Sequence, residues 1–191
     1  MITSELQGAI YGGEPEKRQI SKSSPLEVIE PHRYILWRRF ESAATVGEMC
    51  AFIGLNPSTA TAEKLDNTVS RCEFYAQNWG YAGFIMLNLF SYRATYPEDM
   101  LTHQDPTGDP HNLAAILWAS QNAGRVVCAW GNDGAHRERS SFVKQQLESN
   151  KVELYCLKVN KTREPFHPLY ASKKLKPQRW TDELIPGKTL V

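Results

Sequence analysis

The chain has 191 residues, of which 41% are hydrophobic and 23% charged, and its formal net charge is +1. This composition is typical of one globular domain and excludes a fibre, a coiled coil and wholesale disorder. No segment approaches the roughly 20 apolar residues of a membrane span, and the N-terminal region lacks a signal-peptide pattern. We therefore expect a cytoplasmic protein without a membrane partner.

The first 30 residues are polar and show no periodicity, and Gly12, Gly13, Pro15 and Pro25 interrupt any regular element. The sequence predicts an irregular N-terminal arm over residues 1–30 and a single α/β domain over residues 31–191. A first strand is expected at residues 33–40.

The rest of the domain alternates strands with helices. Residues 49–55 form a continuous apolar run, typical of a strand buried on both faces, and Asn56-Pro57 stops it. Helix-start residues and closing glycines predict the helices. Further strands are expected at 84–90, 125–130 and 152–157, and helices at 66–80, at 109–124 and around 142–147. This alternation predicts a three-layer α/β/α sandwich with a central, mostly parallel sheet, in which ligands bind beyond the carboxyl ends of the strands.

Several common kinds of site have no signal in the sequence. The four cysteines stand singly and no two histidines have a helical metal-ligand spacing, so we expect no metal and no cofactor. Dinucleotide-binding, phosphate-loop and nucleophile-elbow motifs are absent, which argues against a dehydrogenase, a nucleoside triphosphatase and an esterase.

Polar residues do gather where the predicted strands end. One group starts at Gly54-Leu55-Asn56-Pro57-Ser58, and others lie at Asn88, at Trp130-Gly131 and at His167-Pro168. Each motif alone is a weak signal, but four of them at one sheet edge predict a binding or catalytic site.

These motifs resemble two groups of proteins. With Asp66, Arg93-Ala94-Thr95 and the end of the His167-Pro168-Leu169-Tyr170 loop, they closely resemble a bacterial and phage family known as a domain of unknown function, over roughly residues 33–180. More distantly, the order of the four motifs is similar to that of the uracil-DNA-glycosylase superfamily. That second resemblance implies a glycosylase-like fold and a pocket for a nucleobase.

The superfamily resemblance also implies roles for single residues. Asn56 would orient a water, His167 would stabilise the departing base, and Asp66 would be a substitute for the catalytic carboxylate of the fastest members. Asn88 would read the base edge. The further residues expected to bind the base or ligand are Gly54, Leu55, Pro57, Ser58, Phe90, Tyr92, Arg93, Trp130 and Leu169, and those expected to bind phosphate are Arg71, Lys173, Lys174 and Lys176.

Structural alternatives remain open for the main residues. Asp66 has the position of a helix N-cap, and Asn56 could belong to an ordinary turn. Asn88 could satisfy buried backbone groups, and His167 could make a structural hydrogen bond.

Charge along the chain is uneven. Residues 158–179 hold seven basic residues and one acidic residue, a net charge of +6, which leaves −5 for the rest of the chain. Such a patch could bind phosphates, or it could be a solvated surface. The sequence thus predicts an N-glycosylase that removes a modified or mismatched base, with DNA or a nucleotide as substrate. The alternatives are a non-catalytic binder of modified DNA, nucleotide or small ligand, and a hydrolase of the glycosidic bond in free nucleosides or nucleotides.

Overall fold

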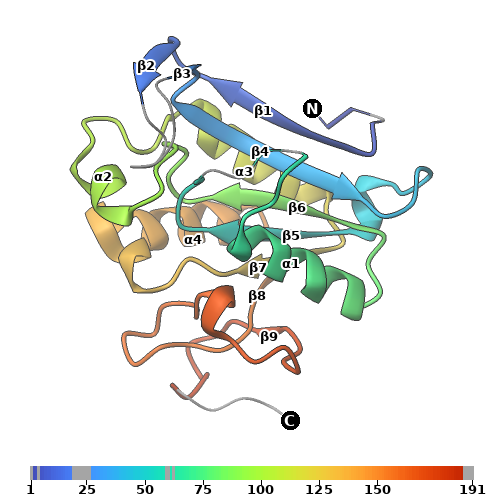
Figure 1. The fold of residues 1–191 in the computed structure, drawn as a ribbon. Helices are drawn as coiled ribbons and strands as arrows, with labels where there is room; N and C mark the ends of the chain where they lie inside the picture. The colour runs from blue at the N-terminus through green and yellow to red at the C-terminus, as the bar shows by residue number, and fades with distance from the viewer. Residues whose placement is uncertain (1, 4, 19–26, 59–60, 62, 187–191) are drawn as a thin grey trace.

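The computed structural model describes residues 2–3, 5–18, 27–58, 61 and 63–186. Its centre is one mixed sheet of seven strands in the order β1-β4-β6-β5-β7-β8-β9 (Figure 1). The strands are β1 (Gln7–Gly12), β4 (His32–Arg39), β5 (Met49–Gly54), β6 (Gly83–Asn88), β7 (Arg125–Cys128), β8 (Leu154–Cys156) and β9 (Gln178–Arg179). A separate two-stranded sheet pairs β2 (Glu16–Arg18) with β3 (Glu27–Ile29).

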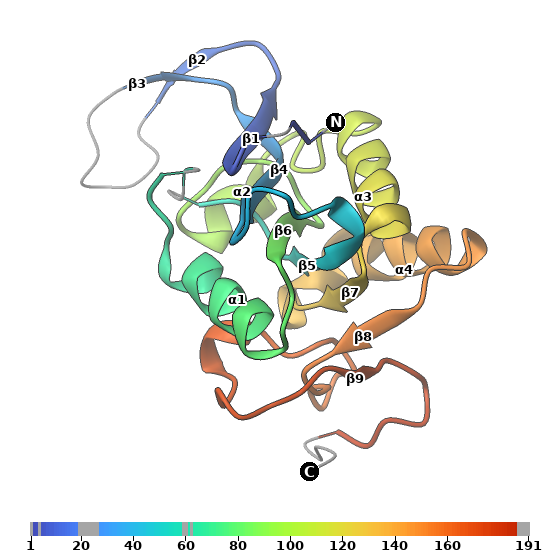
Figure 2. The same ribbon diagram turned by 90° about the vertical axis from the view of Figure 1, so that its right-hand side faces the viewer.

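The helices are α1 (Asn67–Asn78), α2 (Pro97–Thr102), α3 (His111–Asn122) and α4 (Arg139–Ser149), with 3-10 turns η1 (Val46–Glu48), η2 (Asn132–Glu138) and η3 (Pro168–Tyr170). Figure 2 shows α1 on one side of the central strands and α3 and α4 on the other. Within the part of the chain that the structure describes, no helix has the length and apolar character to span a membrane.

The centre of the sheet is parallel, as the sequence predicts. β6, β5, β7 and β8 run parallel to one another, whereas the pairs β1–β4, β4–β6 and β8–β9 are antiparallel. Every residue of β5 is buried. Its side chains alternate between two cores: Ala51 and Ile53 pack on the side of α3 and α4, and Cys50 and Phe52 on the side of α1. The continuous apolar run of β5 follows from this double burial.

The N-terminal region differs from the expected irregular arm. Residues 7–12 form strand β1, which pairs with β4 along its whole length. The glycines in this segment allow close packing, since a Cβ at Gly12 would lie 2.6 Å from the Tyr34 ring and one at Gly8 would collide with Trp37. Gly12, which was expected to interrupt any regular element, and Gly8 therefore make room for two large side chains of β4.

Candidate functional site

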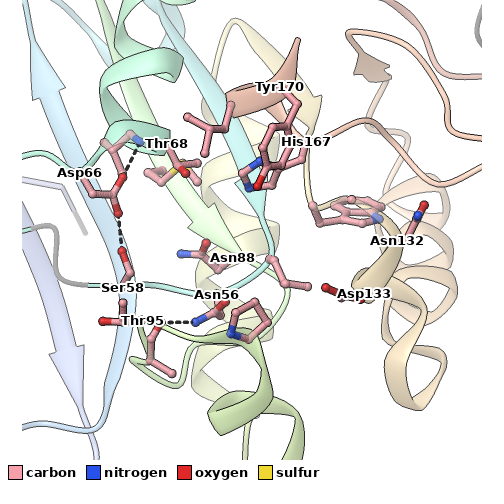
Figure 3. A pocket seen from close by; sticks show the side chains of 18 of the residues that line it. Asn56, Ser58, Asp66, Thr68, Asn88, Thr95, Asn132, Asp133, His167 and Tyr170 are labelled. Atoms are coloured by element: carbon pink, nitrogen blue, oxygen red, sulfur yellow. Dashed lines mark hydrogen bonds between the residues drawn. The ribbon is translucent and has the colours of Figure 1, made fainter. Parts of the chain in front are cut away.

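A pocket of about 530 Å³ opens beyond the carboxyl ends of the parallel strands, where the sequence predicts it (Figure 3). Its walls come from the loops after β5, β6 and β7, from the start of α1 and from the segment around η3. Eight of the predicted site residues line it: Leu55, Asn56, Ser58, Asp66, Asn88, Trp130, His167 and Leu169. Thr59 and Ala60, which complete the first loop motif, lie outside the described residues.

Asn56 joins the loop after β5 to the loop after β6. Its Nδ2 donates to the carbonyl oxygens of Pro57, at 3.1 Å, and Ala94, at 2.8 Å. The backbone N–H of Ala94 donates back to the Pro57 oxygen at 2.8 Å. With its amide nitrogen held in this way, Asn56 can offer Oδ1 as a hydrogen-bond acceptor to whatever enters the pocket.

Asn88 is the most unusual residue of the pocket. Its side chain is 1% exposed, yet neither Nδ2 nor Oδ1 has a hydrogen-bond partner among the described residues. A buried polar side chain without partners costs roughly 1–3 kcal/mol. The end of β5 approaches it closely, because a Cβ at Gly54 would lie 3.0 Å from Asn88 Oδ1 and 2.6 Å from Met86 Cε. Asn88 thus presents one donor and one acceptor to the pocket (Figure 3).

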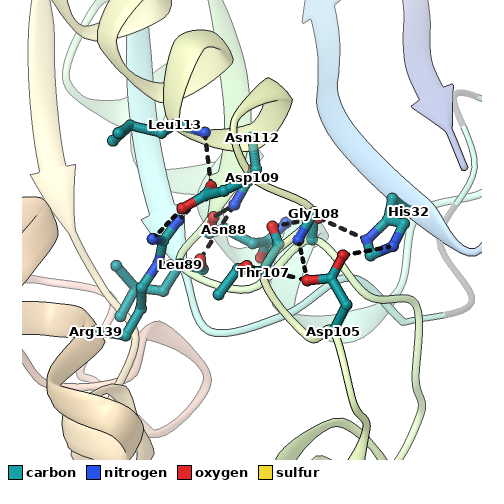
Figure 4. Close-up of polar contacts among 11 residues, drawn as sticks. His32, Asn88, Leu89, Asp105, Thr107, Gly108, Asp109, Asn112, Leu113 and Arg139 are labelled. Carbon is teal, nitrogen blue, oxygen red and sulfur yellow. Dashed lines mark hydrogen bonds and ion pairs between the residues drawn. The ribbon is translucent and has the colours of Figure 1, made fainter.

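The backbone that carries Asn88 is held by side chains of α3 and α4 (Figure 4). Asn112 Nδ2 donates to the carbonyl oxygens of Asn88 and Leu89, each at 3.1 Å, and Arg139 Nε donates to Leu89 at 2.9 Å. These carbonyls belong to the last residue of β6 and to the residue after it, where the sheet ends. Two buried side chains supply donors instead. The orientation of Asn88 is therefore fixed through its backbone, and its side-chain amide stays available.

Asp66 is the N-cap of helix α1, which was the structural alternative to a catalytic role. One carboxylate oxygen accepts from the backbone N–H of Val69 at 2.8 Å, and the other accepts from the Ser58 hydroxyl. Both oxygens therefore serve the local structure, and the carboxylate ties the first loop to the helix (Figure 3).

His167 follows a tight hairpin formed by residues 158–166. Within it Phe166 N–H donates to Lys158 at 2.9 Å, and Gly131 N–H donates to Pro165 at 2.9 Å, which fastens the hairpin to the end of β7. His167 Nδ1 is buried without a partner among the described residues. Burial lowers the pKa of His167 below its ordinary value of 6.5, while the negative charges of Asp66 and Asp133 act in the opposite direction. The imidazole is thus kept neutral near pH 7, with one N–H donor.

Trp130 forms a fixed wall of the pocket. Its indole Nε1 donates to Glu164 at 2.6 Å, and Ser140 in α4 donates to the other oxygen of the same carboxylate at 2.8 Å. Gly134 packs directly against the ring, since any Cβ there would collide with it. Glu164 therefore links the end of β7 to α4 and to the hairpin that carries His167.

Some predicted site residues lie elsewhere. Phe90 is fully buried beside His136, Tyr92 stacks on His103 at 3.7 Å, and Arg93 is a buried residue over the Tyr11 ring. Arg71 donates to the carbonyl oxygen of Ala171 at 3.0 Å. None of these four lines the pocket, and neither do Gly54, Pro57, Lys173, Lys174 and Lys176, the last three of which are exposed.

Other residues line the pocket without having been assigned a role from the sequence. Those that belong to the predicted motifs or stand beside them are Thr68, Ala94, Thr95, Gly131, Asn132, Asp133, Phe166 and Tyr170, and those with no signal in the sequence are Arg33, Val69, Met86, Pro97 and Asn160. Arg33 lies in the first predicted strand, where a charged residue gives no sign that it faces a pocket; burial lowers its pKa to about 10, so it stays a cation. Asn132 and Asp133 directly follow the Trp130-Gly131 motif and belong to the same group of polar residues at the end of a predicted strand. Among the described residues, no three His, Cys, Asp or Glu side chains group as metal ligands do.

Comparison with known proteins gives a family. No curated protein and no solved structure shows detectable similarity to the chain. A family's sequence model matches residues 33–169, which run from the second residue of β4 to the second residue of η3 and contain most of the pocket. Since this match covers more than half of its residues, the chain belongs to the family described as "Protein of unknown function (DUF1643)".

Proposed function

We propose that the pocket binds a nucleobase and that the protein is an N-glycosylase, which removes a modified or mismatched base from DNA. The proposed fold is a three-layer sandwich of the uracil-DNA-glycosylase type. The observation that carries the proposal is Asn88, whose buried donor and acceptor have no partner among the described residues and face the pocket. A flat ring with one donor and one acceptor on an edge would satisfy both groups at once.

Two further residues suit cleavage of the bond between base and sugar. Asn56 offers Oδ1 as an acceptor for a water, because its Nδ2 is held by Pro57 and Ala94. The neutral His167 can donate one N–H to the base as negative charge develops on it. The reaction needs both effects, since it generates a positive sugar and an anionic base.

The charges of the pocket favour a base or nucleoside part over a phosphate. Among the described lining residues Arg33 is a cation and His167 is neutral near pH 7, whereas Asp66 and Asp133 are acidic. Phosphates of a DNA strand would instead lie outside the pocket, where Lys173, Lys174 and Lys176 are exposed on the segment after η3. A DNA substrate also agrees with the cytoplasmic location expected from the sequence.

One observation favours a second candidate, a non-catalytic binder on the same scaffold. Asp66, the carboxylate expected to take part in catalysis, uses both of its oxygens to hold Val69 and Ser58. A protein that only recognises a base needs Asn88 but no reactive carboxylate.

A base-release assay separates the two candidates. The protein is incubated with pooled duplex and single-stranded DNA carrying uracil, mismatches and oxidised or hypermodified pyrimidines, and free bases are identified by mass spectrometry. We expect release of one base by the wild type and none by Asn56→Ala or Asn88→Ala. If the folded wild type releases no base from any substrate in the pool and a nucleoside raises its melting temperature, the protein is a non-catalytic binder.

A further inference from the structure

A glycosylase that works through an oxocarbenium-like sugar gains from a carboxylate that faces the developing positive charge. Asp66 is poorly suited to this task, because hydrogen bonds from Val69 N–H and the Ser58 hydroxyl occupy its two oxygens. Such bonds reduce the negative charge that either oxygen can offer to a substrate. A second carboxylate in the pocket would therefore be the better candidate.

Asp133 is that second carboxylate. It lies in η2, lines the pocket, and its side chain makes no hydrogen bond or ion pair with any described residue. In Figure 3, Asp66 and Asp133 lie on opposite sides of the pocket, with Asn88 and His167 between them. The negative charge of Asp133 also acts on His167, whose pKa it raises against the effect of burial. Its carboxylate is thus within electrostatic reach of the proposed reaction centre.

The backbone around Asp133 is held although its side chain is unpaired. Gly131 N–H donates to Pro165 at 2.9 Å, and the Asn132 side-chain oxygen accepts from the Thr162 hydroxyl at 2.7 Å. Both contacts fasten the start of η2 to the hairpin that leads to His167. Asp133 is exposed and lines the pocket, so its carboxylate, on a backbone fixed in this way and with no structural partner of its own among the described residues, is available to a bound substrate.

We propose that Asp133 is the catalytic carboxylate of this site and that Asp66 is a structural cap. The inference rests on the proposed glycosylase function. A water held at Asn56 Oδ1 attacks the anomeric carbon of the sugar, and the bond from that carbon to the base nitrogen breaks with its electron pair on the base. Asp133 accepts the proton that the water loses. The anionic base, bound by the His167 N–H, then takes up a proton from solvent.

The test compares Asp133→Asn with Asp66→Asn in single-turnover base release. Asp133→Asn should reduce the rate at least about 100-fold, the range of a positioned general base, without lowering the melting temperature. Asp66→Asn should cause a smaller loss, because Asn still accepts from the helix N–H. Asp99→Asn is the matched control: it removes an exposed carboxylate of α2 that does not line the pocket, and its rate should stay within about twofold of the wild type.

The outcomes separate this inference from the function on which it rests. A wild type that releases no base from any substrate overturns both. An active wild type whose rate survives Asp133→Asn, or falls more with Asp66→Asn, overturns the assignment of Asp133 alone. A readout that needs no substrate is the titration of His167 by NMR: loss of the Asp133 charge should lower the pKa of His167 further. An unchanged pKa would contradict the placement of Asp133 beside the reaction centre.

Discussion

Arg139 and Asp109 form a two-point ion pair in which Nη1 lies 2.6 Å from Oδ2 and Nη2 lies 3.0 Å from Oδ1 (Figure 4). The guanidinium is almost fully buried, and its Nε donates to the carbonyl oxygen of Leu89. Asp109 in turn accepts from the backbone N–H of Leu113 in α3 at 3.1 Å. One ion pair therefore holds the starts of α3 and α4 against the end of β6, directly behind the pocket.

Removing Asp109 should destabilise the protein strongly. Asp109→Leu leaves the buried Arg139 without its counter-charge, and we expect the free energy of unfolding to fall by about 3 kcal/mol. Urea denaturation monitored by fluorescence measures the change. Lys144→Met is the control, since Lys144 pairs with the exposed carboxylates of Glu148 and Asp182, and should cost no more than about 0.5 kcal/mol. Equal losses of unfolding free energy in the two variants would show that the buried ion pair contributes no more than an exposed one.

Asn88 and Asn112 should respond oppositely to the same substitution. Both are buried, but Asn112 donates to two carbonyl oxygens, whereas the Asn88 amide has no partner among the described residues. Asn112→Leu should lower the free energy of unfolding by about 2 kcal/mol, because it removes two hydrogen bonds to carbonyl oxygens, of which the one at Leu89 keeps Arg139 Nε as a donor. Asn88→Leu should leave it unchanged or raise it by up to about 1 kcal/mol, while abolishing ligand binding. Urea denaturation of both variants decides this, and a large loss for Asn88→Leu would mean that its amide has a structural role.

The different surroundings of these two asparagines could not be predicted from the sequence, although the position of the pocket could. The apolar runs of β5 and β6 predicted the centre of the sheet, and its parallel direction predicted that Asn56, Asn88 and His167 would converge on one pocket. Nothing in the sequence tells which of the two buried side-chain nitrogens is hydrogen-bonded, because the partners of Asn112 Nδ2 are backbone groups more than 20 residues away.

Other predicted site residues lie outside the pocket for a similar physical reason. The superfamily resemblance implied that Phe90 and Arg93 bind the base or ligand, but the chain turns after β6 and both side chains are buried without lining the pocket. Arg71 was expected to bind phosphate. It lies four residues before Tyr75 and eight before Trp79, so the three side chains project from the same face of α1. These three side chains donate to carbonyl oxygens of Ala171, Ser172 and Leu175. The four-residue spacing on the helix could be seen in the sequence, but the segment 171–175 that accepts these hydrogen bonds could not be identified from it.

Asp66 should contribute to stability as a helix cap. Asp66→Ala removes the acceptor of the Val69 N–H and of the Ser58 hydroxyl, so the free energy of unfolding should fall by about 1 kcal/mol. Asp66→Asn keeps a capping oxygen and should cost less than half as much. Thermal unfolding of the two variants, followed by circular dichroism, makes the comparison. A stability equal to that of the wild type for Asp66→Ala would exclude the capping role.

His167 should make stability depend on pH in a defined direction. Its pKa is lowered by burial from the ordinary value of 6.5, so the unfolded chain binds a proton at a pH where the folded protein does not. The contribution to stability is therefore complete above pH 6.5, and it is lost progressively as the pH falls from there toward the lowered pKa of the folded state. His167→Gln cannot bind this proton. The difference in unfolding free energy between wild type and variant, measured in urea from pH 8 to pH 5, should stay constant above pH 7 and shift against the wild type below 6.5. The other four histidines are common to both proteins and cancel in this difference, so a curve that is flat over the whole range would mean that His167 titrates as it does in water.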